Sequence, residues 1–506
     1  MKSKNVTIIG GGACGISLFI ELFLQLRIAG RHQDVSITII EENEQVGRGL
    51  AFGTRQPGHI LNTQAQLMGI HFAEPEHFSQ WLRQHPKRVN DEVVDNQGQD
   101  EAFTTRRLYG DYLVEQFEYY FDLAQKEGMK LELIRARALN VSEAENGYKV
   151  YLSNDAQIGC DYLVLCLGTP VSNLYSELGI RENYFDSPWP SSKILEKVPK
   201  DEAVAIIGSS LSAIDALMTL ADNEHQGKIT FYSLDGLLPR VQVEKPEPYE
   251  CEYLTISSLH QIQRTELRSP FVSEVFRLFI KEAEQVSGKQ IDWQQAERKG
   301  MSAHEYLKQD IEIAAQGGDA LMNIPYALRY DSSPMWNLLD EPAKLKFKKW
   351  LGNYWAINRH CMPMVNAQRI EKLFASGQLE VVANLEDIVY DDSEKKFVLS
   401  CKEKSGSATY LINATGPASA VKDMDSELVQ NLAQSGLIEA EKAGGIKINT
   451  KTMQVIHKEK SLHNLYALGH LANGLLLDSN AVWFNVKTIG TLSHHLIHNL
   501  TGENTL

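Results

Sequence analysis

The chain has 506 residues, a formal net charge of −15 and 43% hydrophobic residues. This length permits two or three domains with full cores, and the acidic balance argues against nucleic acids or anionic membranes as main partners. Six cysteines without a C-x-x-C pair favour a reducing cytoplasm and argue against a disulfide reductase or a cysteine zinc site. The histidines do not show the spacings that are typical of metal ligands, so we predict no metal site. No apolar run is long enough to span a membrane and no signal peptide precedes the first predicted strand, so we expect a cytoplasmic protein.

The first informative pattern is an apolar strand, residues 6–9, that runs into G-x-G-x-x-G. Gly10 permits a tight turn, Gly12 lets the backbone approach a phosphate, and Gly15 lets the following helix pack on the strand. An apolar run over residues 16–26 predicts that helix, whose N-terminus would direct N–H groups at an anion. The predicted dinucleotide-binding residues here are Gly10, Gly12, Ala13, Cys14 and Gly15.

Residues 35–40 read as the second strand and end at Glu41. An acid at this point would accept hydrogen bonds from the ribose hydroxyls of the adenosine half. A solvated acid at a strand end is the alternative.

A second strand, turn and helix pattern covers Ala203 to Asp215. Gly208 stands at the first glycine position of the pattern, while Ser210 and Ala213 stand where the second and third glycines would be. Residues 228–233 predict its partner strand. Two such units about 200 residues apart predict an α/β protein with two Rossmann-like dinucleotide-binding domains.

Two further strands, residues 162–167 and 410–414, end in small-residue turns that would let the chain cross between the two units. A last strand, residues 464–470, leads toward an apolar helix from about Ala481. Residues 238–351 lose strand patterning and predict a helical cap. We therefore expect an FAD-type domain over residues 1–195 and 366–506, with a NAD(P)-type domain inserted at 196–365.

Three segments carry a resemblance to a known family. They are Gly47-Arg48-Gly49-Leu50-Ala51-Phe52-Gly53-Thr54 with His59-Ile60-Leu61-Asn62-Thr63, then residues 103–113 with Arg106 and Tyr109-Gly110, and Trp355 to Pro363. Together they resemble flavoprotein monooxygenases with two dinucleotide-binding domains, in the group that includes FAD-dependent urate hydroxylase and aspartate N-monooxygenase. The likeness covers most of the chain and is weakest over residues 241–321.

This resemblance implies FAD in the first domain and NADH or NADPH in the second. It implies hydroxylation of a small polar metabolite with dioxygen, N-hydroxylation of an amino acid being one form. Asn62 would lie near the flavin ring and act in catalysis, with a turn-forming asparagine as the alternative. The resemblance also implies that Arg48, Thr63 and Arg106 bind the flavin cofactor. The remaining expected cofactor-binding residues are Gly208 and Ser210 in the second turn and Gly416, Gly469 and Asn480 after the later strands, with simple capping of the final helix as the alternative for Asn480.

Arg359 and His360 are candidate catalytic residues that could orient an anionic substrate or stabilise developing negative charge. Arg329 is a candidate for clamping a substrate carboxylate through two hydrogen bonds. A structural ion pair is the alternative for Arg329, and a surface or core-satisfied pair is the alternative for Arg359 and His360. The expected partners are a small-molecule substrate and dioxygen, and a homo-oligomer is compatible with the sequence.

The sequence departs from the group at two places. Asp235 stands where the group carries arginine after the second Rossmann strand, and an acid there would repel a 2′-phosphate and favour NADH. Cys361 stands where the group tends to have a second arginine. Cys361 counts against an anion-binding role for its site. Asp235, with Ser210 and Ala213 in place of glycines, keeps open a flavin oxidase or dehydrogenase that does not use a nicotinamide. A non-enzymatic flavin-binding interaction protein is the other alternative.

Overall fold

The computed structural model describes residues 3–89, 92, 102–243 and 249–502. The chain forms two compact units. The first contains Met1–Gly53, Thr63–Val171 and Pro417–Leu506, and the second contains Thr54–Asn62 and Ser172–Gly416. The short stretch Thr54–Asn62 thus belongs to the second unit although both of its neighbours in sequence belong to the first.

The first unit is built on a six-stranded sheet in the order β16-β17-β7-β1-β2-β3. Its strands run parallel except β16, which is antiparallel to β17. The last four residues of β1, Val6 to Ile9, are buried and apolar except Thr7, as expected for a central parallel strand that is covered on both faces. The two strands predicted from residues 6–9 and 35–40 lie side by side here, with Ile9 paired to Ile40.

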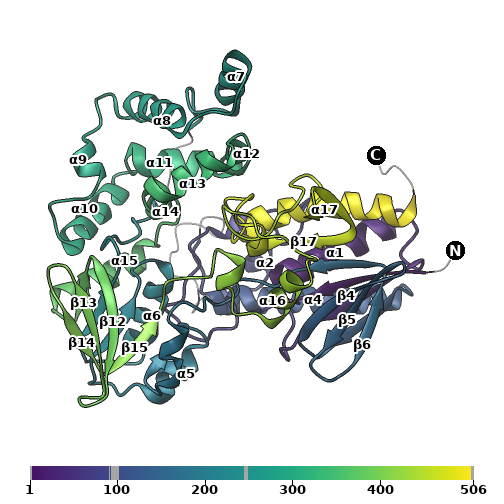
Figure 1. The fold of residues 1–506 in the computed structure, drawn as a ribbon, viewed down its shortest axis with the longest axis horizontal. Coiled ribbons are helices and arrows are strands. Elements are labelled where there is room, and N and C mark those ends of the chain that lie inside the picture. The colour runs from purple at the N-terminus through teal and green to yellow at the C-terminus, as the bar shows by residue number, and fades with distance from the viewer. Residues whose placement is uncertain (1–2, 90–91, 93–101, 244–248, 503–506) are drawn as a thin grey trace. The chain divides into compact units, whose positions relative to one another are not determined.

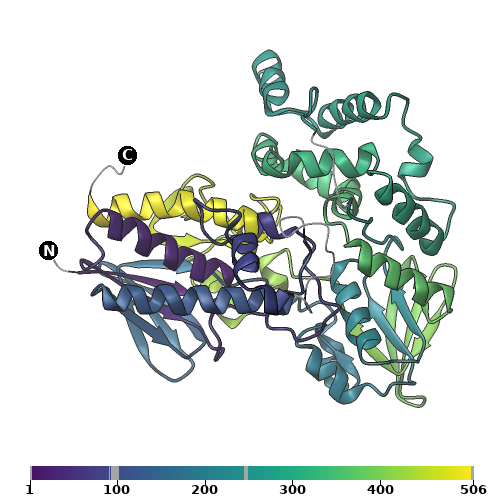
Figure 2. The same ribbon diagram turned by 180° about the vertical axis from the view of Figure 1, so that it is seen from behind.

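Helix α1 of the first unit packs against both α17 and α4 (Figure 1). Figure 2 shows α1, purple, between α17, yellow, and α4, blue. Phe19 of α1 lies 6.0 Å, between ring centroids, from both Phe117 and Phe121 of α4. Because α1 is covered by the sheet and by two helices, its side chains are apolar on nearly every side.

The elements of the first unit follow in chain order. They are β1 (Lys4–Ile9), α1 (Ala13–Ile28), β2 (Val35–Ile40), η1 (Ala65–Leu67), α2 (His77–Gln84), α3 (Pro86–Val89), α4 (Arg106–Lys126), β3 (Lys130–Ile134), β4 (Ala138–Ala144), β5 (Gly147–Leu152), β6 (Gln157–Cys160), β7 (Tyr162–Leu165), η4 (Val421–Asp423), α16 (Glu427–Gln434), β16 (Gln454–His457), β17 (Lys460–Ala467), η5 (Gly469–Ala472) and α17 (Val482–Thr501). Strands β4, β5 and β6 form a separate antiparallel sheet.

The second unit contains a five-stranded parallel sheet in the order β11-β10-β9-β15-β8. One face is covered by α5, α6, α10 and α15, whose buried side chains form one core with Ile206 and Phe231 of the sheet. The other face carries a core shared by Ile207 and by Phe397 of the antiparallel sheet β12-β13-β14. This is the second Rossmann-like unit that the sequence predicts.

The elements of the second unit include the helical cap. They are η2 (Ser176–Ile180), β8 (Tyr184–Phe185), α5 (Ser191–Lys197), β9 (Val204–Ile207), α6 (Leu211–Asp222), β10 (Ile229–Tyr232), α7 (Ile256–Glu266), α8 (Val272–Ser287), α9 (Trp293–Ala296), α10 (Ala303–Ala315), α11 (Ala320–Ala327), η3 (Leu328–Tyr330), α12 (Ser332–Asn337), α13 (Glu341–Trp350), α14 (Gly352–Arg359), α15 (Met364–Ala375), β11 (Leu379–Val382), β12 (Leu385–Asp391), β13 (Lys396–Cys401), β14 (Gly406–Ala408) and β15 (Tyr410–Asn413).

The cap is helical, as its composition predicts, because its helix starts are encoded locally. The side chains of Thr255, Ser302, Asp319 and Asp340 each accept a hydrogen bond from a backbone N–H in the first turn of α7, α10, α11 or α13. Helices α7, α8, α11 and α12 share a small core that includes Leu259, Ala283, Ile324 and Met335.

The observed boundaries differ from the expected ones near 195 and 366. Residues 172–195 and 366–416 belong to the second unit, because β8, β11 and β15 pair within its sheet. The strands β7 and β15 each precede a passage of the chain between units, at residues 171–172 and 416–417. Among the described residues, no helix has the length and apolar character needed to cross a membrane.

Candidate cofactor and active site

The first glycine turn follows β1 and is shaped by its neighbours. Gly10 has φ +102°, a conformation that L side chains rarely adopt, and a Cβ there would lie 2.1 Å from the carbonyl oxygen of Cys166. A Cβ on Gly15 would lie 1.9 Å from the carbonyl oxygen of Gly10. Both glycines are therefore required for the turn itself and for packing α1 on β1.

Gly12 is different, because a side chain there would meet its neighbours at no less than ordinary van der Waals distance. A Cβ built on Gly12 meets only the Cα of Gly49, at 3.8 Å, and no side chain caps the start of α1. The room above Gly12 and the N-terminus of α1 fit a phosphate group that approaches the backbone. Gly49 lies on the other side of this space, and sequence reasoning did not select it. The G-x-G of Gly47 to Gly49 was the available signal.

Glu41 is buried at the end of β2 and accepts three hydrogen bonds. Its Oε2 accepts from the N–H of Gly11 at 2.8 Å, and its Oε1 accepts from the backbone N–H and the side-chain amide of Asn43 at 2.9 and 2.6 Å. The alternative of a solvated strand-end acid is therefore wrong. The carboxylate lies beside the glycine turn.

Residues from the last part of the chain reach the same end of α1. Gly469 has φ +71°, and a Cβ there would lie 3.8 Å from Sγ of Cys14 and 3.9 Å from the carbonyl oxygen of Ser479. Burial raises the pKa of the Cys14 thiol to about 12, so this thiol is neutral at physiological pH. Asn480, predicted to bind cofactor, is exposed to solvent.

Arg48 and Arg106, the two arginines predicted to bind the cofactor, lie near the start of α4 and at its start, respectively. Arg48 forms an ion pair with Asp111 of α4 and donates to Oε1 of Gln45 at 2.8 Å and to the carbonyl oxygen of Arg107 at 3.3 Å. Arg106 is the first residue of α4, next to Thr105, which caps that helix. The guanidinium of Arg48 thus has structural partners within the first unit.

The second glycine turn follows β9 and is reinforced by serines. Gly208 has φ +104°, and a Cβ there would lie 2.6 Å from the carbonyl oxygen of Ala414. Ser209 donates to the carbonyl oxygen of Leu237 at 2.6 Å, and its Oγ lies 3.1 Å from Oγ of Ser233, which can donate to it. Ser210 stands before α6, whose start has no side-chain cap. The turn is thus formed by Gly208 and two serines, with Ser210 in place of the second glycine.

Asp235 is held in the turn that follows β10. Its Oδ1 accepts from the N–H of Leu237 at 3.1 Å, and its Oδ2 accepts from the side-chain amide of Asn353, on α14, at 2.8 Å. Both residues of the Asp235–Asn353 pair are exposed, so the carboxylate remains open to a ligand. Asn353 could not be found from sequence because it is far from Asp235 along the chain.

The segment Thr54–Asn62, which contains predicted catalytic Asn62, is anchored on α6. His59 is fully buried, and its Nε2 donates to the carbonyl oxygen of Asp215 at 2.9 Å. The N–H of Gly58 donates to Oδ2 of Asp222 at 2.7 Å. Asn62 therefore belongs to the second unit, while the next predicted residue, Thr63, belongs to the first. Both side chains are half-buried.

The predicted pair Arg359 and His360 ends α14 and is supported by a buried ion-pair network. Arg240 donates to Asp310 at 2.9 Å, to both oxygens of Asp319 at 2.9 and 2.7 Å, and to Oδ1 of Asn358 at 3.2 Å. The N–H of Met362 donates to the carbonyl oxygen of Arg240 at 2.8 Å. Arg240 thus fixes the chain on both sides of the pair, although sequence reasoning did not select it.

Cys361, which replaces an arginine of the family pattern, is a neutral thiol. Burial raises its pKa to about 12, against the opposing effect of Arg240 and Arg359. Its Sγ donates to the carbonyl oxygen of Asn358 at 3.1 Å.

Arg329 is half-buried and stacks on aromatic rings. Its guanidinium carbon lies 3.8 Å from the ring centroid of Tyr326 and 5.6 Å from that of Tyr330. Cation–π contacts of this kind hold a guanidinium while leaving its N–H groups available for a planar carboxylate.

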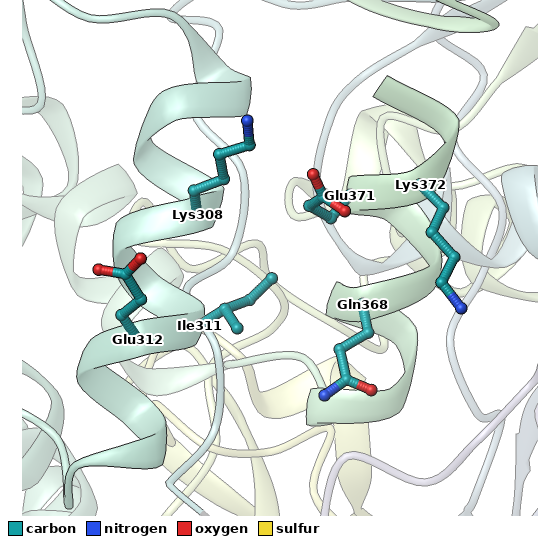
Figure 3. A pocket seen from close by; sticks show the side chains of 6 residues that line it. All are labelled: Lys308, Ile311, Glu312, Gln368, Glu371 and Lys372. Carbon is teal, nitrogen blue, oxygen red and sulfur yellow. The ribbon is translucent and has the colours of Figure 1, made fainter. Parts of the chain in front are cut away.

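A cavity of about 310 Å³ lies between α10 and α15 in the second unit (Figure 3). Figure 3 shows Ile311 on α10 pointing toward α15, from which Glu371 and Gln368 face the cavity. Its lining mixes both signs of charge and contains none of the predicted cofactor or catalytic residues. We assign it no role in the site.

Comparison with known proteins agrees with this architecture. Residues 7–170 match the family model described as FAD-NAD(P)-binding. The protein YdhS of Escherichia coli (strain K12) is 22% identical over 462 residues, which cover 82% of this chain and 83% of YdhS.

Several solved structures share the fold over nearly the whole chain. The ornithine N-hydroxylase KtzI of Kutzneria sp. 744 is 12% identical with a TM-score of 0.58, covering 98% of this chain and 99% of that one. The L-lysine 6-monooxygenase of Pseudomonas syringae is 14% identical with a TM-score of 0.59, covering 98% and 100%. The cadaverine monooxygenase DfoA of Erwinia amylovora, solved with FAD, is 14% identical with a TM-score of 0.55, covering 99% and 96%. The chain has the fold of flavoprotein monooxygenases with two dinucleotide-binding domains, as its motifs predict.

Proposed function

We propose that this protein is an FAD-dependent monooxygenase that uses NAD(P)H and dioxygen to hydroxylate a small polar metabolite. The substrate class that we favour is a primary amine or amino acid, hydroxylated at nitrogen. One oxygen atom enters the amine to give a hydroxylamine, the other leaves as water, and NAD(P)H supplies the two electrons. Bound FAD would supply the redox chemistry that activates dioxygen.

The observation that carries this proposal is the space above Gly12. Gly49 lies opposite Gly12, the start of α1 has no side-chain cap, and the buried carboxylate of Glu41 accepts from the N–H of Gly11, next to Gly12. A phosphate on the Gly12 backbone and a ribose on Glu41 are the two contacts that an ADP group needs. Gly10 and Gly15 would hold the turn in the required shape, Gly469 would lie beside Cys14, and Cys14 would contribute its backbone N–H.

The second unit would bind the nicotinamide coenzyme at the turn Gly208 to Ser210. A finer part of the proposal is that NADH is preferred to NADPH. Asp235 places a negative charge where the 2′-phosphate of NADPH would bring another, and a carboxylate can accept hydrogen bonds from the ribose diol of NADH.

The choice of an amine rests on the fold likeness and on Arg329. The solved structures named above are enzymes of ornithine, L-lysine and cadaverine, which all carry a primary amine. Arg329, stacked on Tyr326, would bind the carboxylate of an amino acid substrate. Asn62, Arg359 and His360 remain the proposed catalytic residues.

Anaerobic reduction of the bound flavin tests the proposal. The purified protein would be mixed with NADH and with NADPH in parallel, and loss of flavin absorbance would be followed. We expect reduction by either coenzyme and faster reduction by NADH. Admission of oxygen with ornithine, lysine or cadaverine present should then yield a hydroxylamine, detected by mass spectrometry as a gain of one oxygen atom.

Each other result has a distinct meaning. A yellow protein that neither coenzyme reduces would favour an oxidase or dehydrogenase that does not use a nicotinamide. A protein that cannot be loaded with FAD would overturn the whole proposal.

A further inference from the structure

The segment Thr54–Asn62 is a strap: nine residues that leave the first unit, bind to the second, and return. The glycine in its middle has no space for a side chain. A Cβ on Gly58 would lie 2.6 Å from Nη1 of Arg369, 2.6 Å from Oδ2 of Asp222 and 2.9 Å from Cβ of Met218. The strap therefore lies directly against α6 and α15.

His59 is the central contact of this strap, and its tautomer is fixed by its partners. A carbonyl oxygen only accepts, so Nε2 carries the hydrogen and donates to Asp215, with Oγ1 of Thr219 also 2.9 Å from Nε2. Nδ1 then accepts from the hydroxyl of Thr54 at 2.8 Å. One ring thus joins the strap to the middle of α6 and closes the strap on its own first residue.

Contacts on either side of His59 hold the rest of the strap. The side-chain amide of Asn366 donates to the carbonyl oxygen of Gly58 at 3.3 Å, and that of Asn223 donates to Oε1 of Gln56 at 2.9 Å. Gln56 in turn donates to Oγ of Ser191 at 3.3 Å. These partners all belong to the second unit.

We propose that His59 is a positioning residue: it fixes the strap on α6 and thereby sets the place of Asn62, three residues further along. The residue predicted to act beside the flavin is then carried by the unit predicted to bind the nicotinamide coenzyme. Helix α6 serves two purposes, since its start would receive the coenzyme phosphates and its middle holds His59. The catalytic part of this inference rests on the proposed function.

Two substitutions of His59 each keep one of the two hydrogen bonds of its ring and so test them separately. Glutamine places an amide N–H near the position of Nε2, so His59→Gln should keep the bond to α6. Asparagine places its oxygen near the position of Nδ1, so His59→Asn should keep only the bond to Thr54. His225→Ala is the matched control, because His225 is a buried histidine of the same unit outside the strap.

Hydrogen exchange of residues 54–62 in the FAD-loaded protein tests the anchor without relying on activity. We expect the strap amides of His59→Asn to exchange about fivefold faster, as for the loss of one hydrogen bond of about 1 kcal/mol. His59→Gln and His225→Ala should exchange in this segment as the wild type does. If the strap amides of His59→Asn exchange at the wild-type rate, His59 does not anchor the strap.

The link to Asn62 is tested by the coupling of NAD(P)H oxidation to hydroxylated product. We expect His59→Asn to lose coupling as Asn62→Ala does, and the double variant to lose no more than Asn62→Ala alone. His59→Gln should restore coupling. Additive losses, or a loss in His59→Gln equal to that in His59→Asn, would overturn the positioning role. If the wild type neither oxidises NAD(P)H nor forms product, the proposed function fails, and the exchange experiment still decides the anchor.

Discussion

The carboxylate of Glu41 accepts a hydrogen bond of 2.8 Å from the backbone N–H of Gly11, in a buried environment. This bond joins the end of β2 to the glycine turn after β1, so the geometry of the turn and the charge at the strand end are set together. An adenosine ribose that binds Glu41 is therefore placed beside the backbone that would bind its phosphates.

We expect Glu41→Gln to weaken FAD binding by about 1.5–3 kcal/mol, the range for hydrogen bonds to a charged group. The measurement is a titration of the flavin-free protein with FAD, followed by quenching of flavin fluorescence. Glu42→Gln removes the same charge from the neighbouring exposed position and should leave the affinity unchanged. Equal affinities for Glu41→Gln and the wild type would remove Glu41 from the FAD site.

Gly12→Val should abolish retention of flavin, because its side chain would fill the space between Gly12 and Gly49. The ratio of flavin to protein absorbance after purification measures this. Gly159→Val makes the same change in the same unit, at a glycine where an added Cβ would have no atom within 4 Å, and should purify with full flavin content. Full flavin content in Gly12→Val would contradict the assignment of this space to a phosphate.

Asp235→Ser should shift coenzyme preference toward NADPH by roughly tenfold, about 1.4 kcal/mol, because one like charge beside the 2′-phosphate is removed. The dissociation constants for NADH and NADPH are to be measured separately by calorimetry. The preference of the wild type for NADH over NADPH should also become smaller as salt is added, because salt screens the repulsion between exposed Asp235 and the 2′-phosphate. A ratio of the two constants that does not change would show that Asp235 does not contact this part of the coenzyme.

Asp310→Ala should destabilise the second unit by about 3–5 kcal/mol, because Arg240 would lose a buried partner. The carboxylate of Asp310 accepts from Arg240 at 2.9 Å and from Arg298 at 2.8 and 3.1 Å. Urea unfolding, followed by tryptophan fluorescence, measures the change. Asp392→Ala, which breaks an exposed pair with Arg181, should have little effect. Similar unfolding midpoints for the two variants would argue against a structural role for the Arg240 network.

The free energy of unfolding should fall as the pH is lowered from about 6.5 to about 4, in part through His71. Burial, and then the neighbouring His77, lower the pKa of His71 from 6.5 to about 4. Between these values the unfolded chain binds a proton that the folded protein does not, so the loss reaches about 3 kcal/mol at the acid end. Urea titrations across this range should show a shallower loss for His71→Gln. An equal slope in variant and wild type would contradict this contribution.

Sequence reasoning located both glycine turns because each depends on neighbouring residues. The run from Val6 to Gly15 encodes strand, turn and helix together, and so does the run from Ala203 to Asp215. The start and end of the second unit could not be found in this way. They depend on β8, β11 and β15 joining one sheet from distant parts of the chain.

The candidate site shows the same division between local and distant contacts. Glu41 follows its strand directly and could be predicted. Arg240 could not, because its partners Asp310 and Asp319 come from the cap, and a lone arginine in a loop has no local pattern. The anchoring of His59 could not be predicted either, because α6 follows it by about 150 residues and only folding brings them together.

The placement of β17 next to β7 has a consequence for synthesis on the ribosome. β17 and α17, which packs on α1, are made only after the whole of Ser172–Gly416 has been translated. Until then one edge of β7 lacks its partner, and an unpaired edge can join other chains. The inserted unit can therefore fold before synthesis ends. The sheet of the first unit is complete only after β17 has been made.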